Sequence, residues 1–144
     1  MMMRFLTLLG LTCSLSVSAQ EGHEKWEASI AAFEARDKEI PPEKGSLLFV
    51  GSSSIRMWDL KASWPEIAVI NNGFGGSTLA DSIHFFDRLF PAYEPSAIIL
   101  YAGDNDIKKG LNAMETSDDF ESLASSITTT FPNIPVIFIA IKPS

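Results

Sequence analysis

Three serines in a row follow a glycine at the end of an apolar run. The run covers residues 47–50, and Ser52, Ser53 and Ser54 come directly after Gly51. A serine on a sharp turn between a strand and a helix can direct its hydroxyl out of a sheet as a nucleophile, and backbone N–H groups at the start of a helix favour a developing negative charge. This chemistry is acyl transfer. A serine in this position can equally act as an ordinary helix cap.

Two further segments carry groups that suit the same chemistry. Gly73, Gly75 and Gly76 lie in the segment NNGFGGS, where the backbone can approach a ligand closely and an N–H beside Gly76 can bind an oxyanion. Asn105 in the segment GDND offers a side-chain amide, which donates hydrogen bonds but is neither acid nor base. The structural alternatives are a tight glycine turn and an Asx turn. The glycine spacing differs from the dinucleotide fingerprint, which argues against nucleotide binding.

Four unbroken apolar runs are expected to form the strands that position these segments, at residues 46–50, 67–70, 97–101 and 136–141. Such runs are typical of strands that are buried on both faces. Helical patterns lie before and between them, and the alternation predicts one α/β domain with a parallel sheet. Ligands of such sheets bind at the carboxyl ends of the strands, so the three polar segments should converge on one crevice.

The helices are expected at residues 24–39, 54–63, 78–90 and 117–130, and the segments at 71–77 and 102–106 are expected as loops. In the first helix the apolar positions recur at helical spacing, and Pro41 and Pro42 should end it. These positions are Trp26, Ile30, Phe33 and Ile40. In the last helix Phe120, Leu123 and Ile127 share one face. We interpret Asp104 and Asp106, beside Asn105, as turn residues and not as a cation site.

The first 19 residues have the pattern of a signal peptide. Arg4 precedes an apolar stretch, and small residues before Gln20 suit cleavage after Ala19. The stretch is too short for a membrane span, which needs about 20 apolar residues. Cys13, the single cysteine, lies in this segment, and Leu11-Thr12 before it does not match the small residues that lipid attachment prefers. We therefore expect export, secreted or periplasmic, with residues 20–144 forming the domain.

The charge balance narrows the classes of partner. The chain carries a net charge of -7, which becomes -8 once Arg4 is removed with the leader, and its basic residues are scattered. This pattern argues against nucleic-acid binding. An acidic surface favours solubility and identifies no substrate, and the sequence specifies no oligomeric state.

Taken together, the segments LLFVGSSSIRMW, NNGFGGSTLAD and YAGDND resemble the SGNH or GDSL-type serine hydrolases, a family of esterases and lipases. The resemblance implies a flavodoxin-like three-layer α/β/α sandwich and no metal or organic cofactor. It implies that Ser53 is the nucleophile, with its own N–H in the oxyanion hole, and that Gly76 and Asn105 are the other two oxyanion donors. Ser52 occupies the place of the aspartate in the family name, as in the GSSS branch.

The resemblance also implies a late Asp-x-x-His motif, which the 144 residues do not contain. A serine needs such a base to remove its proton. We expect His23 to be a solvated residue in a frayed segment and His84 to lie on a helix surface, so neither is expected to serve. The sequence is therefore interpreted as the N-terminal portion of a longer protein, without a last strand and helix and nearly inactive by itself.

The expected function is that of an exported serine esterase. Its substrates would be esters with small acyl groups, on a carbohydrate or on a lysophospholipid-like molecule. The alternatives are a non-catalytic module of the same fold that binds a glycan or a partner, a phosphate-binding module that uses the glycine segment, and an inactive fragment.

Overall fold

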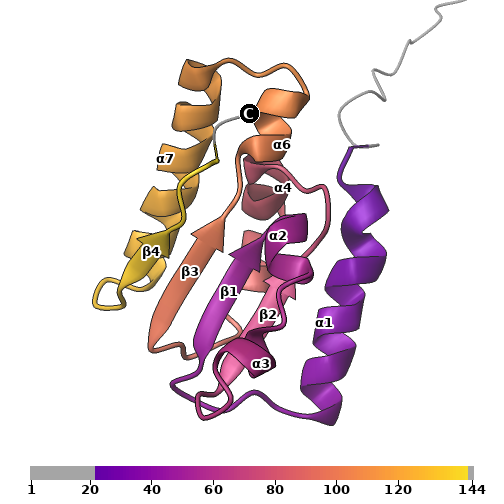
Figure 1. Ribbon diagram of the computed structural model, residues 1–144, viewed down its shortest axis with the longest axis vertical. Helices are drawn as coiled ribbons and strands as arrows, with labels where there is room; N and C mark the ends of the chain where they lie inside the picture. Colours follow the sequence, from indigo (N-terminus) through magenta and orange to yellow (C-terminus); the bar gives the residue numbers. More distant parts are fainter. Residues whose placement is uncertain (1–21, 143–144) are drawn as a thin grey trace, which may run out of the picture.

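The computed structural model describes residues 22–142. Its centre is a four-stranded, all-parallel sheet in the order β2-β1-β3-β4 (Figure 1). The strands are β1 (Leu47–Gly51), β2 (Val69–Gly73), β3 (Ala97–Tyr101) and β4 (Val136–Phe138). Gly51 lies opposite both Gly73 and Tyr101, so the first three strands end at the same level. The predicted α/β class with a parallel sheet is confirmed.

Helices cover both faces of the sheet, which makes three layers (Figure 1). One face packs against α1, α4, α5 and α7, and the other packs against the short helices α2 and α3. The bounds are η1 (Glu24–Trp26), α1 (Glu27–Glu39), α2 (Ser53–Arg56), α3 (Leu60–Ser63), α4 (Leu79–His84), α5 (Phe86–Leu89), α6 (Asp104–Lys108) and α7 (Ala113–Thr130). This arrangement agrees with the predicted three-layer, flavodoxin-like sandwich.

Alternation along the strands divides the core between the two faces. Leu48 and Val50 point toward α1, where Ile30 is fully buried, and Phe49 points toward Ile55 and the short helices. Leu123 and Ile127 of α7 are also fully buried, as their helical spacing predicted. Each such side chain contributes about 1.5–3 kcal/mol by leaving water. Ile40 is 71% exposed, because α1 ends at Glu39 and Ile40 has an extended backbone that leaves the direction of the helix.

β1 lies one residue later than expected, and two other strands differ more from their expected bounds. β2 begins at Val69 instead of at 67 and continues through Asn71 and Asn72, which were expected in a loop. Their side chains make this possible, since Asn71 Nδ2 donates to the carbonyl of Ile55 at 2.8 Å and Asn72 Nδ2 donates to that of Leu89 at 3.2 Å. β4 ends at Phe138, three residues early, and its apolar side chains are partly exposed because β4 pairs only with β3 among the described strands.

The last helix, α7, begins four residues before the expected residue 117. Two other expected helices and one expected loop were wrong in kind. The helix expected at 54–63 is two short helices, because Asp59 begins a new one by accepting a hydrogen bond from the N–H of Ala62 at 2.9 Å. The helix expected at 78–90 is interrupted at Phe85, between α4 and α5. The third polar segment is not a loop: after Gly103, residues 104–108 form α6.

Gly51 allows β1 to end directly against β3. Its φ of +149° lies outside the range that side chains favour, and a Cβ atom there would lie 2.0 Å from the carbonyl oxygen of Tyr101. The same carbonyl accepts a hydrogen bond from the N–H of Ser52 at 3.1 Å. Only a glycine can therefore hold the start of the serine segment against the end of β3.

We expect Gly51→Ala to lower the free energy of unfolding by about 3 kcal/mol or more, because a backbone atom must move in addition to the strained φ. Gly45→Ala is the matched control. Gly45 also has a positive φ, +81°, but its added Cβ would meet nothing within 4 Å. The control should therefore lose only about 1 kcal/mol. Urea unfolding of both variants measures the difference, and equal losses would contradict this account of Gly51.

Candidate active site

The serine segment follows β1, the strand at which the order of strands in the sheet reverses. The chain goes from β1 to β2 on one side and returns to β3 on the other, and ligands of parallel α/β sheets bind beside such a reversal of strand order, at the carboxyl ends of the strands. Ser53 is the first residue of α2, just after the carboxyl end of β1, and is half-buried. Its Oγ forms no hydrogen bond with any other residue of the range 22–142. Its N–H lies in the first turn of α2, where no helical carbonyl is available to it.

Ser52 joins the first polar segment to the third. Its backbone is extended, and it is fully buried. The Ser52 hydroxyl donates to Oδ1 of Asp104 at 3.3 Å, and its N–H donates to the end of β3. Ser52 is therefore part of the support of the turn, and Ser53 beside it keeps an unengaged hydroxyl.

Asn105 joins the third segment to the second. Its Nδ2 donates to the carbonyl oxygen of Ser77 at 2.9 Å, and the residue is half-buried. A side-chain amide has two N–H donors, so this bond orients the group and leaves the second donor for a ligand. The three predicted segments thus meet at one edge of the sheet, through Ser52–Asp104 and Asn105–Ser77.

Gly76, the second predicted oxyanion donor, has a left-handed backbone conformation with φ of +83°. It is half-buried, and a Cβ atom there would lie 3.3 Å from the ring of Trp26. On the other side of this segment, a Cβ atom on Gly75 would meet Nε of Arg56 at 2.6 Å. The glycine segment is therefore packed between Trp26 at the start of the first helical region and Arg56 of α2.

Asp106 is a site residue whose part the sequence did not reveal. It is fully buried, and its two carboxylate oxygens accept the N–H of Leu79 at 3.0 and 3.2 Å. Burial raises its pKa above the ordinary value, and the bond from Leu79 partly offsets this effect. Asp106 therefore holds α6, which carries Asn105, against the start of α4, and its interpretation as a turn residue was wrong.

The two histidines lie away from Ser53 Oγ, and His23 is not the solvated residue that was expected. Its Nδ1 lies 2.6 Å from Oδ1 of Asp81, and its ring stacks on His84 at 4.3 Å between centroids. Burial opposes ionisation of Asp81, but hydrogen bonds from Thr78 and His23 outweigh it and lower the pKa of Asp81. No base contacts the Ser53 hydroxyl within the part of the chain that the structure describes.

The described residues contain no group of three or more histidine, cysteine, aspartate or glutamate side chains that could hold a metal ion. Across residues 22–142 no helix is long and apolar enough to cross a membrane. The expected signal peptide, residues 1–19, lies outside the described residues.

No family model and no curated protein matches the sequence. The fold, however, matches solved structures. A proposed platelet activating factor from Streptococcus pneumonia superposes with a TM-score of 0.74 and 20% identity, over 83% of this chain and 56% of that one. A GDSL-like lipase from Bacteroides thetaiotaomicron VPI-5482 gives 0.69 and 18%, over 81% and 60%. The chain has the fold of this GDSL-like lipase, which we call the GDSL fold.

A third structure, a proposed GDSL-like lipase from Parabacteroides merdae ATCC 43184, gives a TM-score of 0.53 and 14% identity, over 69% of this chain and 61% of that one. At these identities the likeness establishes the fold alone. The chain spans between 56% and 61% of the length of these three structures.

The buried carboxyl group of Asp106 should make the free energy of unfolding depend on pH. Because its folded pKa is raised, the folded state binds a proton more readily than the unfolded chain does. The free energy of unfolding of the wild type should therefore rise relative to that of Asp106→Asn as the pH falls from neutral to about 4, the ordinary pKa of an aspartate. Urea unfolding at both pH values measures this. A relative loss for the wild type on acidification would contradict it.

Asp106→Ala provides the second comparison. It leaves the buried N–H of Leu79 without its acceptor, which should cost about 1–3 kcal/mol at neutral pH. The asparagine variant retains an acceptor oxygen and should unfold at a higher urea concentration than the alanine variant. Equal midpoints would show that the bond to Leu79 contributes nothing.

Proposed function

We propose that the protein is an exported serine esterase that hydrolyses a carboxylic ester through an acyl-enzyme on Ser53. The observation that supports this proposal most directly is the contact of Asn105 with Ser77. It brings an amide donor and the glycine segment to the edge of the sheet where the unengaged Ser53 hydroxyl begins α2. The GDSL fold agrees with this chemistry.

In the proposed reaction, Ser53 Oγ attacks the carbonyl carbon of the ester and loses its proton to a base. The carbonyl oxygen becomes an oxyanion that accepts hydrogen bonds from the N–H groups of Ser53 and Gly76 and from the Asn105 amide. Collapse breaks the bond to the alcohol, which leaves with the proton. Water then attacks the acyl-serine by the same route and releases the carboxylic acid.

The base is assigned to a part of the protein outside residues 22–142. Both described histidines are engaged, His23 with Asp81 and His84 with the ring of His23. We propose that an Asp-x-x-His motif, as in the GDSL-type hydrolases, supplies the histidine and the carboxylate that orients it.

The proposed substrates are esters with small acyl groups, either on carbohydrate or on a lysophospholipid-like molecule. Export rests on the pattern of residues 1–19, in which a charged start precedes a short apolar stretch and small residues. Hydrolysis by this mechanism requires neither a metal nor an organic cofactor.

One observation favours a second candidate, a non-catalytic module of the same fold that binds a glycan or a partner in the crevice. The histidine and carboxylate pair that the described residues contain, His23 with Asp81, joins η1 to α4 and makes no hydrogen bond to Ser53. A crevice with oxyanion donors but no base can bind a polar ligand without turning it over.

We expect Ser53→Ala, made in the full natural protein, to lower kcat for p-nitrophenyl acetate by about 10³-fold or more, because the nucleophile is lost. Ser54→Ala is the control. Ser54 is the next residue of α2 and is exposed, so this variant should keep the wild-type activity. A wild-type rate that Ser53→Ala does not change would exclude the acyl-enzyme. It would favour the binding module.

Asn105→Ala tests the oxyanion hole separately. Removal of one such donor costs about 10²–10³-fold in kcat. We expect a loss of this size with little change in KM, measured with the same ester. A change confined to KM would place Asn105 in substrate binding and not in stabilisation of the oxyanion.

A further inference from the structure

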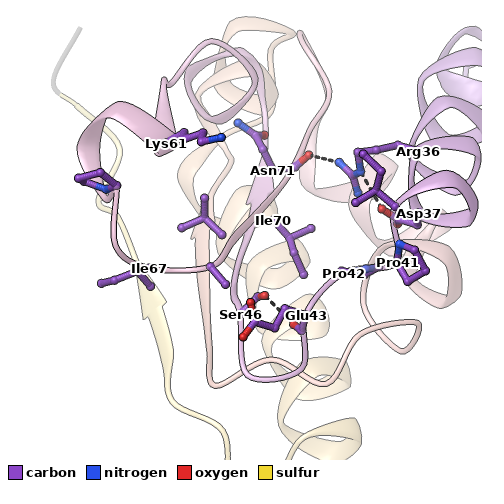
Figure 2. A pocket seen from close by; sticks show the side chains of 14 residues that line it. Arg36, Asp37, Pro41, Pro42, Glu43, Ser46, Lys61, Ile67, Ile70 and Asn71 are labelled. Atoms are coloured by element: carbon purple, nitrogen blue, oxygen red, sulfur yellow. Dashed lines mark hydrogen bonds and ion pairs between the residues drawn. The ribbon is translucent and has the colours of Figure 1, made fainter.

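A groove runs along the free edge of β2, away from the carboxyl ends of the strands. Its volume is about 770 Å³, and it lies between the end of α1 and the segment around α3. Figure 2 shows Arg36 and Pro41 on one side, Lys61 and Ile67 on the other, and Ile70 of β2 between them. In the described sheet β2 pairs only with β1, so its outer edge faces this groove.

At Val69 and Asn71 the outer edge of β2 carries backbone groups that lack hydrogen-bond partners within residues 22–142. Ala68 accepts a bond from β1 at 2.9 Å and Phe74 donates one to it at 2.9 Å, so the alternate residues 69, 71 and 73 face outward. Arg36 Nη1 donates to the outward carbonyl of Asn71 at 2.9 Å. The N–H and carbonyl of Val69 and the N–H of Asn71 have no partner within residues 22–142. These three groups form an open template for one more strand.

The two walls of the groove differ in chemistry. The wall on the side of α1 presents apolar Ile40, Pro41 and Pro42 together with the acidic Glu43, and the wall on the side of α3 presents the basic Lys61 together with apolar Pro65 and Ile67. Lys61 is exposed and forms no ion pair with the described residues. Ile70 faces the α1 side and Val69 faces the α3 side. A strand beside β2 would thus place alternate side chains against each wall.

We propose that this groove binds an extended peptide segment that adds to the sheet beside β2, with apolar side chains toward Ile40 and acidic side chains toward Lys61. The walls decide between a peptide and a second copy of the chain. Paired strands lie about 4.8 Å apart, and two edges that are both recessed between walls cannot approach so closely. A single extended segment can. The proposal is independent of Ser53 and of the esterase chemistry.

The test uses the full chain and the peptide Val-Glu-Val-Glu-Val-Glu-Val with blocked ends. Hydrogen exchange measured by NMR should show the amides of Val69 and Asn71 slowed by about tenfold or more on saturation with the peptide, because both become donors to the new strand. An unchanged exchange rate at both amides, or protection elsewhere in the chain only, would overturn the proposal.

Two methylated peptides test whether backbone bonds hold the segment. In a parallel strand the valine amides face β2, and in an antiparallel strand the glutamate amides do. N-methylation of one set should therefore weaken binding by about tenfold or more, while methylation of the other set is tolerated. The sensitive set gives the strand direction. Equal binding of both methylated peptides would overturn the proposal.

Two variants complete the test. Val69→Pro removes one outward N–H at an edge position that tolerates proline, and it should abolish the protection at Asn71. Lys61→Glu leaves the backbone unchanged. It should lower the affinity for the glutamate peptide by about tenfold and raise the affinity for a Val-Lys peptide of the same length. A Lys61→Glu variant that binds both peptides as the wild type does would overturn the charge assignment. A dimer in sedimentation that Val69→Pro dissociates would show a second copy as the occupant instead.

Discussion

The parallel register of β1 with both of its neighbours is the constraint on which the candidate site depends. Gly51 stands opposite Gly73 on one side and Tyr101 on the other, so three strands deliver their following segments to the same level. A shift of either pairing would separate the serine segment from the glycine segment or from Asn105. The absence of a side chain at Gly51 permits this register, because a Cβ atom there would collide with the carbonyl of Tyr101.

Buried polar groups then fix the segments to one another. Asp106 holds the start of α4, Asn105 holds Ser77, and Ser52 holds Asp104. None of these bonds uses Ser53, whose half-buried hydroxyl forms no hydrogen bond within residues 22–142. The residues that support the candidate site are therefore different from Ser53, the proposed nucleophile. That separation is what a preorganised oxyanion site requires.

Much of this arrangement could be predicted from the sequence, and the exceptions have physical causes. The apolar run at 97–101 matches β3 residue for residue, because every residue of this strand is apolar and all but the first are buried. Asn71 and Asn72 suggested a loop by their type, but long-range bonds to Ile55 and Leu89 place them in β2. The role of Asp106 and the pairing of His23 with Asp81 both depend on residues 27 or more positions away, which no local pattern encodes.

The central claim is that Ser53 is the nucleophile of an ester hydrolase. The most direct measurement is mass spectrometry of the full natural protein after reaction with a fluorophosphonate, followed by peptide mapping of the adduct. The account predicts one stable phosphonyl group per chain, attached to Ser53 and not to Ser52 or Ser54. An unmodified chain, or an adduct confined to another residue, would contradict the assignment of Ser53.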